Sequence, residues 1–106
     1  MKTHVQRAAL VAAVVLLPTF THAQSIAGVV RDASGAVLPG VTVEAASPAL
    51  IEKIRTAVSD GSGQYRIENL TPGNYKVTYT LPGFTTVERA GVEVTTGVTV
   101  TLNTDM

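Results

Sequence analysis

Apolar and polar residues alternate along most of the chain that follows residue 24. In the clearest run, residues 75–81, every second side chain is apolar. The apolar residues are Tyr75, Val77, Tyr79 and Leu81, and a lysine or a threonine lies between each neighbouring two. Such an alternation is typical of a β-strand with one side against a core and the other in water. Valine and threonine are abundant in these runs, and their β-branched side chains pack well on a pleated sheet. The pattern predicts an all-β domain.

Shorter alternations occur elsewhere in the chain. In each of these runs, the residues at every second position on the mainly apolar side are Val41, Val43 and Ala45; Ile54, Thr56 and Val58; Tyr65 and Ile67; Val92 and Val94; and Val98, Val100 and Leu102. Clusters of Gly, Pro, Asn and Asp separate the runs at intervals of roughly eight to twelve residues, which favours an antiparallel sandwich of about seven short strands. Pro48 interrupts any strand in residues 46–52, so we expect an exposed loop or a sheet edge there.

The first 23 residues have a different pattern. A basic start with Lys2, His4 and Arg7 precedes an unbroken apolar run at residues 8–17, and small residues precede Gln24. This order is typical of a secretory signal peptide. The apolar run has ten residues, about half of the roughly 20 that a helix needs to cross a membrane. We therefore expect an exported protein with a signal peptide at residues 1–23, one domain at residues 24–106 and no transmembrane span.

The composition of the predicted domain narrows the chemistry further. The chain has no cysteine and no tryptophan, and both histidines, His4 and His22, lie in the predicted leader. Metal sites built on imidazole or thiolate, and nucleophiles that need a histidine or cysteine, are therefore excluded from the domain. Without Lys2 and Arg7, six of the eight Lys and Arg remain against eight Asp and Glu, a balance that does not suggest a nucleic-acid partner. We expect no enzymatic activity, no cofactor and no metal.

The segment Asp60-Gly61-Ser62-Gly63 is a candidate ligand loop. A calcium loop needs oxygen ligands at alternate positions after the aspartate, and those carboxylates are missing. A phosphate loop needs a lysine and a helix after the glycines, whereas a strand is predicted to begin near Tyr65. We interpret the segment as a turn, in which Asp60 accepts backbone hydrogen bonds and Gly61 and Gly63 take positive φ cheaply.

The segment from Leu70 to Tyr75 contains a second turn, at Pro72-Gly73. A leucine, a Pro-Gly turn and a tyrosine at the start of the next strand are typical of the tyrosine corner of Greek-key sandwiches. We expect the Tyr75 hydroxyl to bind a backbone carbonyl a few residues upstream.

The aromatic side chains allow one alternative function. Tyr65, Tyr75, Tyr79 and Phe84 could in principle form a stacking platform for a sugar ring. The three tyrosines lie on the inward side of their predicted strands, so we expect them in the core and Phe84 at the surface. A carbohydrate site would need an exposed aromatic pair.

Five motifs in order resemble the carboxypeptidase regulatory-like domain. They lie in "IAGVVRDASGAVLPGVTVEA" and "TAVSDGSGQYRIENLTPGNYKVTYTLPGF", and their residues are Gly28 and Val30; Asp32 and Gly35; Pro39, Gly40 and Val43; Asp60, Gly63 and Tyr65; and Leu70, Pro72, Gly73 and Tyr75. The resemblance implies a transthyretin-like, seven-stranded antiparallel Greek-key sandwich. The peptidase activity of metallocarboxypeptidases belongs to a different domain.

A signal peptide followed directly by this module resembles the N-terminus of TonB-dependent, Oar-like outer-membrane receptors. The resemblance implies a non-catalytic accessory module in the periplasm or at the outer membrane, with a receptor plug or barrel or another envelope protein as its partner. The chain would then be either an independent module or the front fragment of a receptor gene. The alternative is a carbohydrate-binding module that uses Phe84; a hydrolytic enzyme is a third hypothesis.

Overall fold

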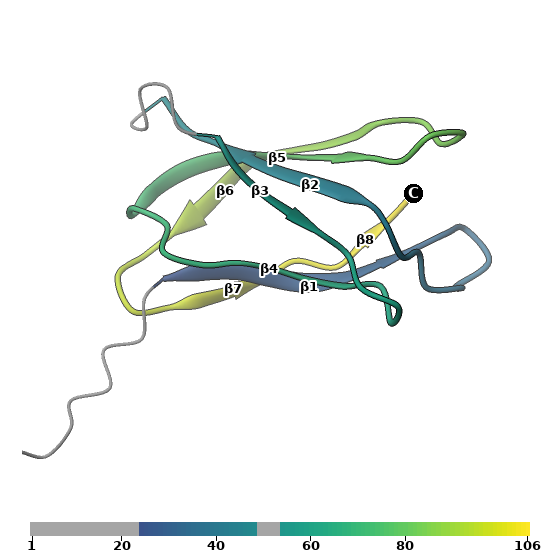
Figure 1. Cartoon of the computed structure of the whole chain (residues 1–106). Coiled ribbons are helices and arrows are strands. Elements are labelled where there is room, and N and C mark those ends of the chain that lie inside the picture. Colours follow the sequence, from purple (N-terminus) through teal and green to yellow (C-terminus); the bar gives the residue numbers. More distant parts are fainter. Residues whose placement is uncertain (1–23, 49–53) are drawn as a thin grey trace, which may run out of the picture.

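The computed structural model describes residues 24–48 and 54–106, which form two packed β-sheets (Figure 1). The strands are β1 (Ser25–Arg31), β2 (Thr42–Ala46), β3 (Arg55–Val58), β4 (Gln64–Ile67), β5 (Gly73–Thr80), β6 (Val87–Val94), β7 (Thr99–Thr101) and β8 (Thr104–Asp105). The described residues contain no helix, so the predicted all-β sandwich is confirmed. The predicted signal peptide at 1–23 and residues 49–52 of the predicted loop lie outside this range.

The strand count and the pairing differ from the expectation of seven antiparallel strands. One sheet has the order β4-β1-β7, with β8 also against β1, and the other has the order β3-β2-β5-β6. The second sheet is antiparallel throughout, but β7 and β8 run parallel to β1. A parallel pair needs a crossover connection. Here the chain leaves the first sheet after β4 and forms β5 and β6 in the second sheet. It then returns to the first sheet as β7, which runs beside β1 in the same direction.

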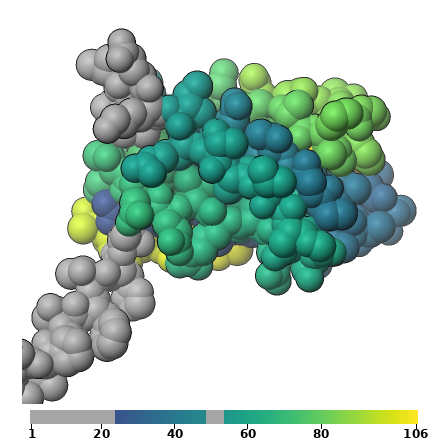
Figure 2. All heavy atoms as spheres, viewed as in Figure 1, coloured from purple at the N-terminus to yellow at the C-terminus, as the bar shows by residue number. Residues whose placement is uncertain are grey.

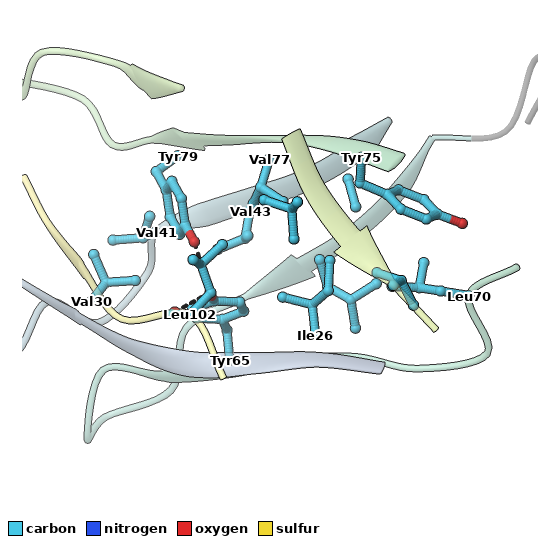
Figure 3. Close-up of a cluster of buried hydrophobic side chains, with 14 residues drawn as sticks. Ile26, Val30, Val41, Val43, Tyr65, Leu70, Tyr75, Val77, Tyr79 and Leu102 are labelled. Atoms are coloured by element: carbon cyan, nitrogen blue, oxygen red, sulfur yellow. Dashed lines mark hydrogen bonds between the residues drawn. The ribbon is translucent and has the colours of Figure 1, made fainter. Parts of the chain in front are cut away.

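Alternate side chains of both sheets meet in a single core (Figure 3). The buried members are Ile26, Val30, Val41, Val43, Ala45, Tyr65, Ile67, Leu70, Tyr75, Val77, Tyr79, Val92, Val94 and Leu102. The inward positions predicted for β2, β4 and β5 are therefore confirmed. Apolar burial of this kind provides the main stabilisation of a domain without disulfides.

One alternation faces the opposite way from the sequence pattern. In β3 the small side chain of Ala57 packs against the core, whereas Val58 of the same strand and Ile54 just before it are each 60% exposed. β3 is the last strand of its sheet and lies beside β4 of the other sheet. The register explains the orientation, because Ala57 is the cross-strand partner of buried Val43 and Val58 is the partner of Thr42 on the outer face.

The last strand of the first sheet is interrupted at Leu102 and Asn103. The Leu102 amide donates to the Ala27 carbonyl at 2.8 Å, and the Val29 amide then donates to the side-chain Oδ1 of Asn103 at 3.0 Å instead of to a backbone oxygen. The Leu102 carbonyl crosses over Gly28, where a Cβ atom would lie only 1.9 Å from that oxygen. A glycine is therefore required at position 28, and β7 and β8 are two short strands rather than one.

Candidate functional site

The outer edge of β3 has unpaired backbone groups. Just beyond the ladder, the Ser59 amide donates to the Val41 carbonyl at 2.9 Å and the Ser59 carbonyl accepts from the Gly40 amide at 3.0 Å, so both backbone groups of Ser59 face the segment that leads into β2. Hydrogen-bonded and non-hydrogen-bonded pairs alternate along such a ladder. The backbone groups of Ala57 therefore point toward β2, and those of Thr56 and Val58 point away from it. No other strand of the described chain pairs with this side of β3.

Two apolar side chains lie beside this edge. Ile54 and Val58 project from the outer face of the sheet, and exposed Thr56 lies between them. Arg55 projects from the other face; it is exposed and makes no ion pair within residues 24–48 and 54–106. In Figure 2 the teal segment that contains β3 lies at the surface of the molecule. The edge thus combines free hydrogen-bonding groups, an apolar pair and a positive charge.

The other edge of the same sheet, β6, is protected against pairing. Its register with β5 shifts between Tyr75 and Val77, and Gly91 has a φ of 71° at this irregularity. A bulge of this type twists the strand and disrupts its row of hydrogen-bonding groups. Glu88 on this strand also forms an exposed ion pair with Lys76 at 3.6 Å. Bulges and charges are common devices that prevent strand addition, and β3 has no bulge in its ladder with β2.

A groove of about 540 Å³ adjoins the β3 edge and runs across the first sheet. Residues of β1, of β4 and of the β7–β8 segment line it, and they include Ala27, Val29, Gln64, Arg66, Thr101 and Asn103. Val58 and Asp60 line the part nearest to β3. The groove therefore extends the accessible surface beside the free edge.

Three polar side chains of the groove are held in place by other hydrogen bonds. Asn103 accepts from the Val29 amide, and the Arg66 Nε donates to Glu68 at 2.7 Å. The Asp60 Oδ1 accepts from the amides of Ser62 and Gln64 at 2.9 and 3.0 Å. These contacts fix the orientation of the three polar groups in the groove. Within the described residues, no cluster of three or more Asp and Glu side chains is placed to hold a metal ion.

The Asp60 segment connects β3 to β4 as a tight turn. Besides the two side-chain contacts, the Gly63 amide donates to the Asp60 carbonyl at 2.9 Å. Gly63 has a φ of 73° and lies against Val30 and Leu38, whereas Gly61 does not have a positive φ and has open space around it. The expectation of positive φ was therefore wrong for Gly61. The hydrogen bonds are those of a turn.

A second loop of the same construction begins at Asp32. Its Oδ1 accepts from the amides of Ser34 and Ala36 at 2.8 and 3.0 Å, and Gly35 has a φ of 90°. The Ser34 hydroxyl, followed by the Ala36 amide, lowers the pKa of the Asp32 carboxyl. The two loops have similar sequences, "DASGA" and "DGSGQ", with Asp, Ser and Gly at the same positions. This similarity is the sequence signal for the second loop, and the pattern of apolar residues did not reveal it.

The residues of the predicted corner lie together between β4 and β5. The Tyr75 hydroxyl donates to the Thr71 carbonyl at 2.5 Å, which is the hydrogen bond expected of a tyrosine corner. Leu70 is buried, Pro72 is exposed and Gly73 begins β5. Burial raises the pKa of the Tyr75 hydroxyl. The arrangement fastens the chain where it passes from one sheet to the other.

The aromatic residues do not form an exposed pair in the described part of the chain. Tyr65, Tyr75 and Tyr79 are 4%, 2% and 0% exposed, and Phe84 is 39% exposed in the loop between β5 and β6. The geometry that a carbohydrate site was expected to need is therefore missing at these four residues. Core packing is confirmed for the tyrosines.

A family model decides the relationship of this chain to known proteins. The model of the carboxypeptidase regulatory-like domain matches residues 25–106. The chain belongs to this family. No curated protein is significantly similar to it. No helix among the described residues is long and apolar enough to span a membrane.

Several solved structures are similar to this regulatory-like domain. A chain of the type II cohesin-X-dockerin complex from Acetivibrio cellulolyticus is 28% identical, with a TM-score of 0.59 over 76% of this chain and 51% of that chain. The Bacillus anthracis TIE protein is 17% identical, with a TM-score of 0.56 over 79% of this chain and 16% of that one. Chlorocatechol 1,2-dioxygenase from Pseudomonas putida is 15% identical, with a TM-score of 0.55 over 85% and 63% of the two chains.

These similarities differ in what they show. The likenesses at 17% and 15% identity show the fold alone. The domain spans about half the length of the cohesin-X-dockerin chain that it matches. One neighbour is an enzyme and another comes from a protein complex, so the shared fold does not indicate a function.

The motifs of the regulatory-like domain serve mainly to shape its turns. Gly28 allows the close approach of Leu102, Asp60 and Gly63 close one turn, and Tyr75 fastens the corner. The free edge of β3 lies between two motifs and was not identified from the sequence. The signal that points to it is Pro48, which predicted a loop or a sheet edge shortly before Ile54.

Proposed function

We propose that this domain is a non-catalytic interaction module that binds a protein partner at the free edge of β3. The observation that carries the proposal is the unpaired backbone of Thr56 and Val58 beside two apolar side chains that are each 60% exposed. An exposed edge strand is a ready template for another strand, and most proteins protect such edges. Here β6 has a bulge and an ion pair, whereas β3 has no bulge in its ladder with β2.

Similarity to a chain of a protein complex supports a role in assembly. The 28% identical chain comes from a complex of a cohesin with an X-dockerin. The known peptidase activity of metallocarboxypeptidases resides outside their regulatory-like domain, and the tyrosine hydroxyls of this chain are engaged in core hydrogen bonds. We propose that the domain contributes contacts rather than catalysis.

The partner proposed for this module is a protein of the bacterial envelope. The pattern of residues 1–23 supports export, and the resemblance to the front of TonB-dependent receptors supports a place in the periplasm or at the outer membrane. The partner is then the plug or barrel of a receptor, whether encoded with this domain or separately, or another protein of the same compartment.

Site-specific photo-crosslinking in the cell envelope tests this proposal. A photoreactive amino acid at position 58 lies on the β3 edge. The matched control has the same amino acid at position 80, where Thr80 is exposed at the end of β5, a central strand of the same sheet. We expect a discrete crosslinked protein from position 58, identified by mass spectrometry, and none from position 80. Equal products from both positions, or none from either, would contradict an interaction at β3.

A further inference from the structure

We infer that the β3 edge accepts an extended, acidic segment of its partner as an added antiparallel strand. This inference rests on the proposed function and specifies the chemistry of the bound segment. The sheet β3-β2-β5-β6 is antiparallel throughout, and one more antiparallel strand would continue it. Main-chain hydrogen bonds to Thr56 and Val58 would provide affinity, and the neighbouring side chains would provide selectivity.

The apolar pair determines one feature of the added strand. Ile54 and Val58 lie on one face and are two positions either side of Thr56, which matches the two-residue period of a strand. Side chains directly opposite each other in an antiparallel pair are close enough to pack. The bound segment therefore carries apolar residues opposite Ile54 and Val58 and a small residue opposite Thr56.

The charge determines a second feature. Arg55 is exposed, and its charge lowers the pKa of the Tyr75 hydroxyl; among the described residues it forms no ion pair with a carboxylate. A carboxylate opposite Arg55 would be favourable on the opposite face from the apolar pair, because opposite charges across a strand pair stabilise it. The segment is thus an alternation of apolar residues with at least one Asp or Glu.

A second copy of this chain is a poorer occupant of the edge. If two β3 strands paired about Thr56, Ile54 would face Val58 of the other copy, which is favourable. Arg55 would however face Ala57 of the other copy, and its charge would gain no opposite partner. Charge complementarity therefore favours a different, acidic segment over self-association.

The direction of the backbone groups provides a selective variant. The Thr56 amide points away from β2, so Thr56→Pro removes a donor from the outer edge and leaves the ladder with β2 intact. Thr56→Ala is the matched control because it keeps this amide. Ala57→Pro is the opposite control, since the Ala57 amide points toward β2 and its loss should destabilise the sheet.

Amide NMR titration of the full chain with synthetic peptides tests the inference. The probe is a blocked peptide with valine opposite Ile54 and Val58, serine opposite Thr56 and Ala57, and glutamate opposite Arg55. We expect saturable shifts of the Thr56 and Val58 amides, about fivefold weaker binding of a peptide with lysine in place of glutamate, and loss of binding in Thr56→Pro but not Thr56→Ala. Wild-type folding of the Thr56→Pro variant is checked from its dispersed amide spectrum.

Each other outcome overturns the inference. Shifts confined to other strands would place the binding elsewhere, and equal binding of the lysine peptide would refute the acidic preference. Shifts of the β3 amides with protein concentration in the absence of peptide would identify a second copy as the occupant. A crosslinked envelope protein at position 58 together with no peptide binding would leave the proposed function standing and refute strand addition as its mechanism.

Discussion

The hydroxyl of Tyr65 donates a hydrogen bond to the carbonyl of Leu102 in the core of the sandwich. The two residues lie on opposite sides of the central strand β1, and Gly28 of that strand is the cross-strand partner of Tyr65. The Tyr79 hydroxyl lies 2.7 Å from that of Tyr65, and the two rings meet edge to face (Figure 3). A carbonyl that left the ladder is thereby satisfied inside the core, where an unpaired group would be costly.

The close approach of Leu102 predicts that Gly28→Ala is strongly destabilising. The new Cβ would lie 1.9 Å from the backbone oxygen of Leu102. The two segments cannot move apart easily, because the Leu102 amide is hydrogen-bonded to the Ala27 carbonyl. We expect the free energy of unfolding to fall by about 3 kcal/mol or more in chemical denaturation. Gly61→Ala is the control because nothing lies within 4 Å of its added Cβ. Similar losses in both variants would refute the steric explanation.

The burial of Tyr65 predicts a loss of stability at high pH. Burial, followed by the hydrogen bond with Tyr79, raises the pKa of the Tyr65 hydroxyl well above its usual value of 10.0. Above pH about 10 the unfolded chain releases this proton while the folded protein keeps it, so stability should decrease by about 1.4 kcal/mol per pH unit for this group. Urea unfolding between pH 8 and pH 11 measures the slope.

Tyr65→Phe is the matched variant for this pH dependence. It should be less stable than the wild type at neutral pH, because the Leu102 carbonyl loses its donor. It should also show a shallower decrease above pH about 10, with the remaining slope arising in part from Tyr75, whose pKa burial also raises. Identical slopes in the two proteins would show that Tyr65 does not titrate as expected.

The corner predicts a smaller effect for Tyr75→Phe. The substitution removes the donor to the Thr71 carbonyl and keeps the buried ring, so only the hydrogen bond is lost. We expect a decrease of about 1 kcal/mol in the free energy of unfolding, measured by thermal or urea denaturation. A melting curve unchanged from the wild type would show that the hydroxyl contributes nothing to the corner.

The sequence predicted the parts of the fold that depend on local pattern. The alternation of Tyr75, Val77 and Tyr79 identified β5 and its inward face, because a strand in the middle of a sheet must separate a buried from a wet side. The division of the last strand at Asn103 could not be predicted in this way. It depends on a contact between Leu102 and Gly28, which are far apart in the sequence.

The candidate site was less predictable than the fold. Ile54 and Val58 alternate as core residues do, but the register of β3 puts Ala57 beside buried Val43 and Val58 beside Thr42, so Ile54 and Val58 lie on the outer face. Strand order and register arise only when the sheets assemble, and the sequence of a four-residue strand does not specify them. The turn at Asp60, by contrast, is local, and its hydrogen bonds follow from the aspartate and Gly63 alone.

The unpaired edge of β3 is the basis of the account, and amide hydrogen exchange tests it most directly. In the free full-length protein we expect rapid exchange at Thr56 and Val58 and slow exchange at Ala57 and Ser59, whose amides point toward β2. Addition of the glutamate peptide should slow the exchange of Thr56 and Val58 and leave that of Ala57 and Ser59 unchanged. Slow exchange of these two amides in the free protein would show that the edge is already paired and would contradict the account.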